Sequence, residues 1–312
     1  MRRFIARYSP LFILGAVCIV MAVTSASFRD PENLRNVAYR TCVVGIVALG
    51  ETLVILTAGI DLSVGSVAAL SGVVASLLMV DAGWPVVPAC IVGTLVGSVC
   101  GLVSGAIWAK GKIPPFIATL GMMMVARGAT LLVSGAKPIF GLPDSFDYLG
   151  GTRGWWIPVS IAAALTVAFA SMLGFSRLGR AIYATGGNAQ GARLSGIPID
   201  WVRIAAFTLA GSLTGFAGVM LASKVGIGDP NAGVGMELDA IAACVIGGAS
   251  LMGGEGGCVG SVAGALLMTV LVNFCNLKDI DPYWQKVLVG VLIIVLVFYD
   301  TWRKRRAGLL RD

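Results

Sequence analysis

Residues 85–108 have the sequence PVVPACIVGTLVGSVCGLVSGAIW and contain no charged side chain. A helix of this length can cross a hydrocarbon core of roughly 30 Å. The apolar residues are continuous rather than alternating, which favours a membrane helix over a strand of a membrane β-barrel. This stretch therefore predicts a chain that folds inside a lipid bilayer.

Apolar runs of similar length recur along the chain of 312 residues, of which 57% are hydrophobic and only 12% charged. Soluble domains usually contain about 25% charged residues, so we predict an all-α integral membrane protein. Glycine is abundant, as expected where membrane helices pack closely. No linker divides the chain, which predicts a single transmembrane domain over 1–312. We expect about ten spanning helices, at 11–27, 38–59, 62–80, 85–108, 115–134, 155–174, 203–223, 236–252, 257–276 and 283–301.

Two places in this pattern do not fit a regular span. Residues 59–66 form a polar break with glycines between the second and third runs, and the run that begins at 236 is cleanly apolar only from Ala240 to Met252. Non-helical backbone is tolerated at membrane depth only where it is buried in protein or lines a watery cavity. We therefore expect broken, short or re-entrant segments near 59–66 and 240–254.

Basic residues are distributed unevenly between the segments that connect the runs. If the N-terminus is cytoplasmic, Lys and Arg concentrate in the cytoplasmic segments, and acidic residues offset them in the outer ones. This positive-inside pattern predicts that both termini and the loop at 175–203 are cytoplasmic. It also explains the net charge of +7 without a nucleic-acid-binding surface. The run from Leu11 to Val23 also resembles a cleaved signal peptide, but we favour a retained first helix.

The residue inventory argues against most catalytic chemistry. The chain has no histidine, and its seven cysteines lie mostly inside apolar runs without metal-ligand spacing. This excludes a zinc site, a Cys–His nucleophile and a histidine proton relay. The phosphate-binding pattern G-x-x-x-x-G-K-[ST] is absent, so ATP would have to be bound and hydrolysed by another polypeptide. We predict no catalytic residue, no metal and no cofactor.

The polar loop at 175–203 contains the best candidate for a contact with such a polypeptide. Residues 179–185 favour a short helix that stops at Gly186-Gly187, and Asn188 is a good N-cap for a second helix over 189–195. Gly196 suits the C-terminal cap of that helix. A short capped helix on the membrane surface could receive the motion of a motor subunit, although an ordinary loop is the alternative. The candidate coupling residues are Gly187, Asn188, Gln190, Arg193 and Gly196.

Polar residues inside the apolar runs are candidates for a translocation path. Asp61 and Ser63 lie in the break at 59–66, where Asp61 could cap the next helix or face a polar path. Glu51 and Arg127 interrupt apolar runs and could line a path or form a buried structural pair. Glu237 and Asp239 do not suggest catalysis, because residues two apart on a helix do not face each other. The path candidates are Glu51, Asp61, Ser63 and Asn231.

Four separated motifs resemble those of the ribose-type inner-membrane permeases of ATP-binding-cassette (ABC) importers. They are GIDLSVGS at 59–66, GRAIYATGGN at 179–188, GARLSGI at 191–197 and ELDAIAACVIGGASLMGG at 237–254. The resemblance implies a multi-pass permease of about ten helices in the bacterial inner membrane, paired with a second copy. It also implies a cytoplasmic ATPase subunit and a periplasmic or lipid-tethered sugar-binding protein. Glu51 departs from the family pattern, which has an apolar residue in many members.

The motifs do not name the substrate, because the resembling permeases carry pentoses, hexoses, polyols, nucleosides or a furanosyl signal molecule. Three alternatives stay open at this point. An ion-coupled secondary transporter could use Glu51 and Asp61, and an ABC permease for nucleosides or branched-chain amino acids would share the general architecture. An intramembrane enzyme has no nucleophile–base or metal constellation to support it.

Overall fold

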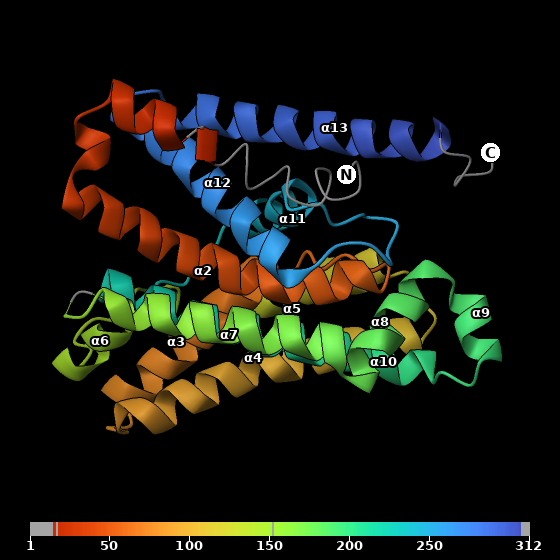
Figure 1. Cartoon of the computed structure of the whole chain (residues 1–312). Helices are drawn as coiled ribbons and strands as arrows, with labels where there is room; N and C mark the ends of the chain where they lie inside the picture. Colours follow the sequence, from red (N-terminus) through yellow and green to blue (C-terminus); the bar gives the residue numbers. More distant parts are fainter. Residues whose placement is uncertain (1–14, 17, 152, 307–312) are drawn as a thin grey trace.

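The computed structural model describes residues 15–16, 18–151 and 153–306. Over these residues the chain is a helical bundle without a β-strand (Figure 1), and one isolated bridge pairs Ile139 with Gly228. The all-α prediction is therefore confirmed. The α-helices are α2 (Pro31–Leu56), α3 (Val64–Val80), α4 (Val86–Ala109), α5 (Pro115–Ser134), α6 (Asp147–Gly150), α7 (Trp156–Phe175), α8 (Arg177–Gly187), α9 (Ala189–Leu194), α10 (Ile199–Val225), α11 (Met236–Ile246), α12 (Cys258–Leu277) and α13 (Pro282–Arg306), with 3-10 turns η1 (Ser27–Arg29) and η2 (Asp144–Phe146).

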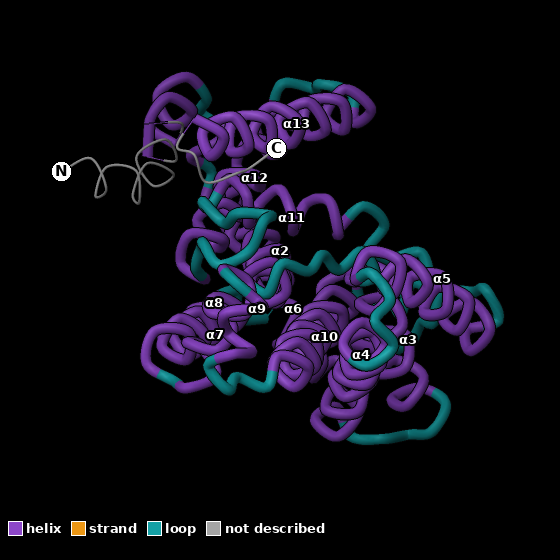
Figure 2. The backbone as a smooth tube through the Cα atoms, turned by 90° about the vertical axis from the view of Figure 1, so that its right-hand side faces the viewer, coloured by secondary structure: helices purple, strands orange, loops and turns teal. Residues whose placement is uncertain are grey.

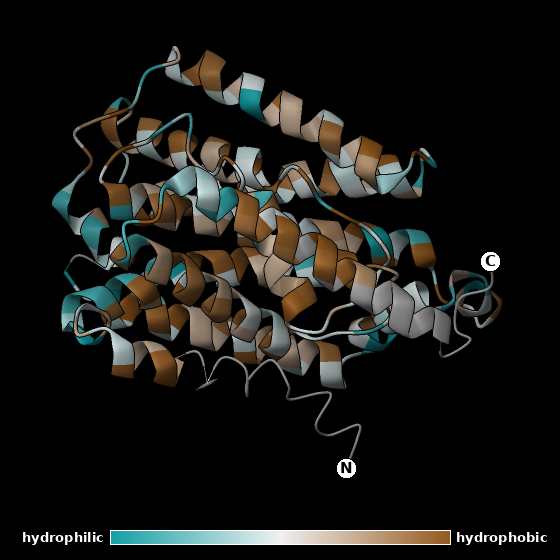
Figure 3. Cartoon of the chain, turned by 90° about the horizontal axis from the view of Figure 1, so that it is seen from above, coloured by the Kyte–Doolittle hydropathy of each residue, from teal (hydrophilic) through white to brown (hydrophobic). Residues whose placement is uncertain are grey.

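The predicted spans coincide with helices along most of the chain. Among the described residues, six helices are long and apolar enough to cross a membrane, namely α2, α4, α5, α7, α10 and α12. The shorter α3 has 17 apolar-rich residues, and α13 covers the last predicted run. Hydrophobic residues line the middle of the helices, and hydrophilic ones lie mainly toward their ends (Figure 3). Of the first predicted span, 11–27, residues 11–14 and 17 lie outside the described residues, and residues 15–16 and 18–24 are helical.

Helix α10 forms the centre of the bundle and packs against α2, α3 and α4. Figure 2 shows α4 and α5 on one side of α10 and α7 on the other. Its residues Ala206, Phe207, Ala210 and Ala217 are fully buried. Packing around α10 therefore fixes the arrangement of the helices that precede it in the chain.

The contact between α4 and α10 is made by glycines. Gly97 and Gly101 of α4 lie so close to α10 that an added Cβ would overlap the carbonyl oxygens of Gly211 and Phe207. In a membrane, lipid tails are as apolar as leucine, so helices associate through close backbone packing rather than the hydrophobic effect. The glycines thus explain how a bundle that faces lipid holds together.

The short helices α8 and α9 lie at one end of the bundle, which we call the α9 end. Helix α13 also ends there (Figure 1). Helix α2 reaches this end at Leu56, whose carbonyl oxygen accepts a hydrogen bond of 3.0 Å from the N–H of Gly254. The α9 end therefore joins three parts of the chain that are far apart in sequence.

Both predicted breaks are present. Helix α2 ends at Leu56 and α3 begins at Val64, so residues 57–63 are not helical. Helix α11 ends at Ile246, and its 11 residues span about 16 Å, or half of a hydrocarbon core. The prediction of one span over 236–252 is wrong beyond Ile246, because Gly248, Gly253 and Gly254 adopt positive φ angles that end the helix.

A third irregular segment, 226–235, was predicted as an outer connection between spans. It instead folds back along α3. Gly228 contacts Ser76 near the end of α3, and Gly233 contacts Gly65 near its beginning. These two α3 positions are about 16 Å apart along the helix axis. The polypeptide from Gly226 to Ile246 therefore consists of a non-helical half rich in turns, followed by the helical half, α11.

Candidate functional site

Asp61 and Ser63 organise the break between α2 and α3. The Ser63 N–H and hydroxyl both donate to Asp61 Oδ1, at 2.8 and 2.6 Å. The carboxylate lies just before the first turn of α3, where a negative charge suits the helix dipole. Both side chains are buried, with 3% and 2% of their surface exposed. Asp61 therefore holds the turn that precedes α3, whereas the N-cap residue of that helix is Ser63, with no side-chain cap hydrogen bond.

Glu51 joins this cluster from α2. Its Oε1 accepts a hydrogen bond of 3.1 Å from the N–H of Asp61, and the residue is completely buried. Among the described residues, Glu51 Oε2 has no hydrogen-bond partner. A buried carboxylate oxygen without a partner is costly, and ionisable residues inside membranes usually serve function. The structure thus brings together Glu51, Asp61 and Ser63, three of the four path candidates.

Asn231 lies elsewhere, in the non-helical segment 226–235. It is exposed, and its N–H donates to Asp229 Oδ1 at 2.8 Å. Within the described part of the chain, no hydrogen bond connects Asn231 with the Asp61 cluster. The two groups of path candidates therefore belong to different broken segments.

Arg127 on α5 holds the non-helical segment 226–235 in place. Its guanidinium donates to the carbonyl oxygens of Pro230 and Ala232, with distances of 3.1 and 3.2 Å to Ala232. A planar guanidinium presents several donors in a fixed fork, which suits two neighbouring carbonyls. Arg127 was noted as a charge inside an apolar run, but no local pattern indicated that its partners lie about a hundred residues later in the chain.

The coupling candidates gather on the surface of the α9 end. Asn188 Oδ1 accepts the N–H of Gly191 at 2.8 Å and so caps α9, and Gly196 has a positive φ angle of 80°. These two local predictions are confirmed. Gly187, Asn188, Gln190, Arg193 and Gly196 are all exposed. They form a continuous accessible turn of the chain.

The base of this turn is packed tightly against the bundle. A Cβ on Gly186 would overlap the Leu56 carbonyl oxygen and lie 2.7 Å from the N of Gly254. By contrast, a Cβ on Gly187 would meet no atom within 4 Å. The end of α8 therefore contacts the residue that precedes the 57–63 break, and a displacement of α9 has a short physical connection to the Asp61 cluster.

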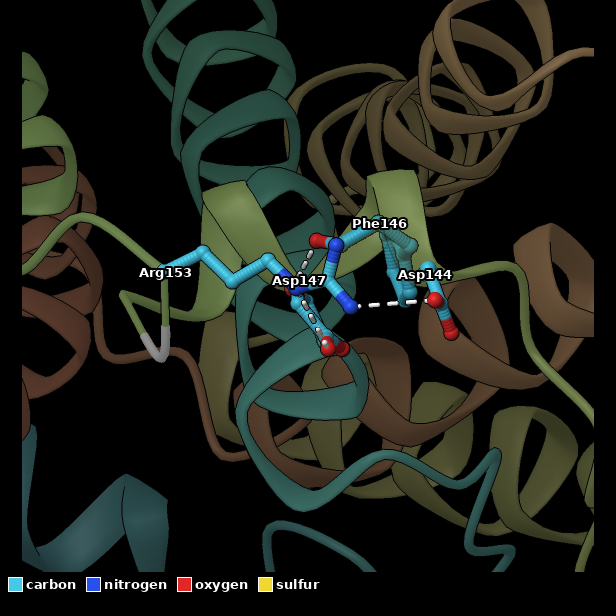
Figure 4. A network of polar contacts seen from close by, with 5 residues as sticks. Asp144, Phe146, Asp147 and Arg153 are labelled. Atoms are coloured by element: carbon cyan, nitrogen blue, oxygen red, sulfur yellow. Dashed lines mark hydrogen bonds and ion pairs between the residues drawn. The ribbon is translucent and has the colours of Figure 1, made fainter.

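Charged residues at the opposite end form a surface network. Arg153 lies 3.0 Å from Asp144 and 3.8 Å from Asp147 (Figure 4), and all three side chains are well exposed. Exposed ion pairs contribute little to stability. In the same region, Ser223 of α10 donates to the Phe146 carbonyl, which fixes η2 on the bundle. Within the described residues, no three His, Cys, Asp or Glu side chains gather to hold a metal ion.

Comparisons with known proteins identify the family. Residues 33–297 match the family described as "Branched-chain amino acid transport system / permease component". The ribose import permease protein RbsC of Haemophilus influenzae is 38% identical, covering 96% of this chain and 94% of the relative. The D-allose transport system permease protein AlsC of Escherichia coli is 36% identical (94% and 91% covered). The L-arabinose ABC transporter permease protein AraH of Azospirillum brasilense is 33% identical (99% and 91% covered).

No solved structure matches the chain. The match extends over most of the chain and includes all four motifs that carried the resemblance in the sequence. The chain therefore belongs to this family of bacterial inner-membrane permeases, and its similarity is to the ribose-type sugar permeases of ABC importers.

Proposed function

We propose that the chain is the membrane-spanning subunit of an ABC importer for a monosaccharide or a related polyol. The observation that carries this proposal is identity of 33–38% to ribose, allose and arabinose permeases over 94–99% of the chain. Those relatives favour a sugar over a branched-chain amino acid or a nucleoside. The arabinose relative is named as an ABC transporter permease, which favours an ATP-driven importer over an ion-coupled transporter.

The subunit would work with partners that supply energy and substrate. ATP would be bound by a separate ATPase subunit on the cytoplasmic side, and the sugar would be delivered by a periplasmic or lipid-tethered binding protein. A second copy of the permease would complete the membrane part as a homodimer, and membrane lipid would surround it. The exposed turn with Gln190 and Arg193, packed at Gly186 against the end of α2, supports α9 as the contact with the ATPase.

The substrate path would pass the broken segments. Transporters often place substrate sites beside discontinuous helices near the middle of the membrane, and this supports Glu51, Asp61, Ser63 and Asn231 as path candidates. Few charges lie in the spans, so selectivity would belong mainly to the delivering protein. Asp61→Asn retains a hydrogen-bond acceptor for Ser63 but removes the charge, whereas Asp61→Ala removes both. Loss of uptake per molecule in both variants supports a path role, and lower abundance alone identifies a helix cap.

Uptake measurements test the energy source. The permease, its ATPase and its binding protein are reconstituted in proteoliposomes with enclosed ATP, and uptake of labelled ribose, allose or arabinose is followed. We expect uptake that needs ATP and persists when ionophores collapse ion gradients. Uptake that needs only an ion gradient would refute an ABC permease. Arg193→Glu should reduce co-purification of the ATPase while membrane insertion is unchanged.

Cysteine labelling tests the orientation. In a cysteine-free background, Gln190→Cys should react with a membrane-impermeant maleimide only after the cells are opened, because α9 and both termini are placed in the cytoplasm by this proposal. Labelling in intact cells would show that α9 faces the outside and would refute the proposed orientation.

A further inference from the structure

A cleft at the α9 end has four basic side chains in its lining. It lies between the turn that connects α4 to α5, residues 110–114, and the segment that leads into α10. Its volume is about 780 Å³, which is ample for a phosphate group with a small alcohol. We call it the basic cleft because Lys110, Lys112, Arg193 and Arg203 line it.

Positive charge in the basic cleft exceeds negative charge. Asp200 is the one acidic residue in the lining, and it lies 3.9 Å from Arg193. Within the described residues, Lys110, Lys112 and Arg203 form no salt bridge. The Nε atom of Arg203 is buried without a hydrogen-bond partner. Asp200 therefore acts on both Arg193 and Arg203, and the lining has four basic side chains against this one acidic side chain.

Of the two tryptophans of the basic cleft, Trp108 is buried in the bundle and Trp201 suits a membrane interface. The Arg203 guanidinium lies 4.2 Å from the ring centre of Trp108, and the ammonium of Lys110 lies 5.3 Å from that of Trp201. Trp201 itself is 65% exposed. Tryptophan is enriched at the level of lipid headgroups, because this region accommodates both its apolar ring and its polar N–H. Arg and Lys side chains next to such a ring lie at the depth of the lipid phosphate groups.

Exposed apolar residues lie on the two helices that the basic cleft connects, α4 and α5. Phe116 and Ile117, on the first turn of α5, are about half exposed, and Val99 and Leu102 of α4 are similarly exposed further along. Phe116 and Ile117 offer a surface for acyl chains close to the lining residues Ile113 and Pro114, and Val99 and Leu102 add apolar surface further along α4. A soluble anion would contact only the cations, whereas a phospholipid would contact the cations with its headgroup and the apolar residues with its acyl chains.

We propose that the basic cleft binds the phosphate headgroup of an anionic phospholipid in the inner leaflet. This inference rests on the proposed function for the membrane orientation, since the α9 end must face the cytoplasm. Basic residues near a membrane surface attract anionic lipids with about 1 kcal/mol each. Because Arg193 lines both the basic cleft and the neighbouring cavity beside Gln190, a bound lipid would also fix the support of α9.

Native mass spectrometry of the full-length permease tests the proposal. The protein is incubated with phosphatidylglycerol, phosphatidylcholine or inorganic phosphate, and the retained species are counted. We expect selective retention of phosphatidylglycerol, and a loss of affinity of roughly 30-fold in Lys110→Gln/Lys112→Gln, since each lysine contributes about fivefold. Both lysines are exposed, so the substitution leaves the fold intact. The control is Lys137→Gln/Lys278→Gln, two exposed lysines at the opposite end, which should retain the wild-type affinity.

Several results would overturn the proposal. Equal retention of phosphatidylglycerol and phosphatidylcholine, or equal losses in the two double variants, would show nonspecific attraction. Competition by inorganic phosphate at the same concentration would indicate a soluble anion. Normal lipid retention with loss of ATPase co-purification in Lys110→Gln/Lys112→Gln would make the basic cleft a protein contact. Sugar uptake is measured separately, so failure of the lipid site is distinct from failure of the proposed transport function.

Discussion

Replacing Arg127 should release the non-helical segment 226–235 from α5. Arg127→Met retains an unbranched apolar stem but removes the donors to the carbonyls of Pro230 and Ala232. Hydrogen bonds to charged groups contribute about 1.5–3 kcal/mol, and polar contacts between membrane helices contribute at most about 1.7 kcal/mol. Taking about 1.5 kcal/mol for each carbonyl gives about 3 kcal/mol, which increases the open population of the segment roughly 100-fold.

Hydrogen exchange measures this opening. The Gly228 N–H donates to the Ile139 carbonyl at 3.0 Å, and the N–H groups of Asn231 and Ala232 donate to Asp229, so their exchange reports on the segment. We expect exchange in 226–235 to accelerate by up to 100-fold in Arg127→Met. Peptides from α8 and α9 should be unchanged and serve as the internal reference.

A conservative variant separates hydrogen bonding from charge. Arg127→Lys keeps the positive charge near Asp229 and Glu237 but has no planar fork for two carbonyls, so we expect an intermediate acceleration. Sugar uptake should fall in the same order if the segment borders the path. Exchange within twofold of wild type in Arg127→Met would refute the reasoning that Arg127 holds this segment.

Two further predictions use glycines as matched pairs. Gly101→Ala should destabilise the protein by about 1–3 kcal/mol, because its Cβ would overlap the Phe207 carbonyl. Gly121→Ala, with open space around its Cβ, should leave the thermal unfolding temperature in detergent unchanged or higher. Equal unfolding temperatures of the two variants would contradict the close α4–α10 contact. Gly186→Ala should weaken the docking of α8 on α2 and lower ATP-driven uptake, because its Cβ would overlap the Leu56 carbonyl. Gly174→Ala, with free space for its Cβ near the end of α7, should transport normally, and an equal loss in both variants would show that the packing of Gly186 is not the cause.

Features of the fold that depend on local residues could be predicted from the sequence. The helices α4, α5 and α7 begin and end within one residue of the expected spans, because the length and apolarity of a run must match the bilayer wherever the run lies. The cap at Asn188 and the left-handed Gly196 were predictable for a similar reason. Each depends on the chemistry of a few neighbouring residues.

The break at 59–66 was also visible in the sequence, since polar residues and glycines interrupt an apolar run. Its construction was only partly visible. Asp61 and Ser63 are neighbours and could be expected to interact, but Glu51 reaches the N–H of Asp61 only because the chain turns after Leu56. Asn231 was grouped with these residues by its polarity, and the structure gives it a place in another segment.

The tertiary structure alone decided which backbones approach each other. Composition showed many glycines, but the pairing of Gly101 with Phe207 and of Gly186 with Leu56 depends on helices that are distant in sequence. The path of 226–235 along α3 depends on carbonyls that find a donor in Arg127. An unpaired carbonyl is costly in a membrane wherever it occurs, so the sequence requires a partner, and only the packed bundle determines which residue supplies it.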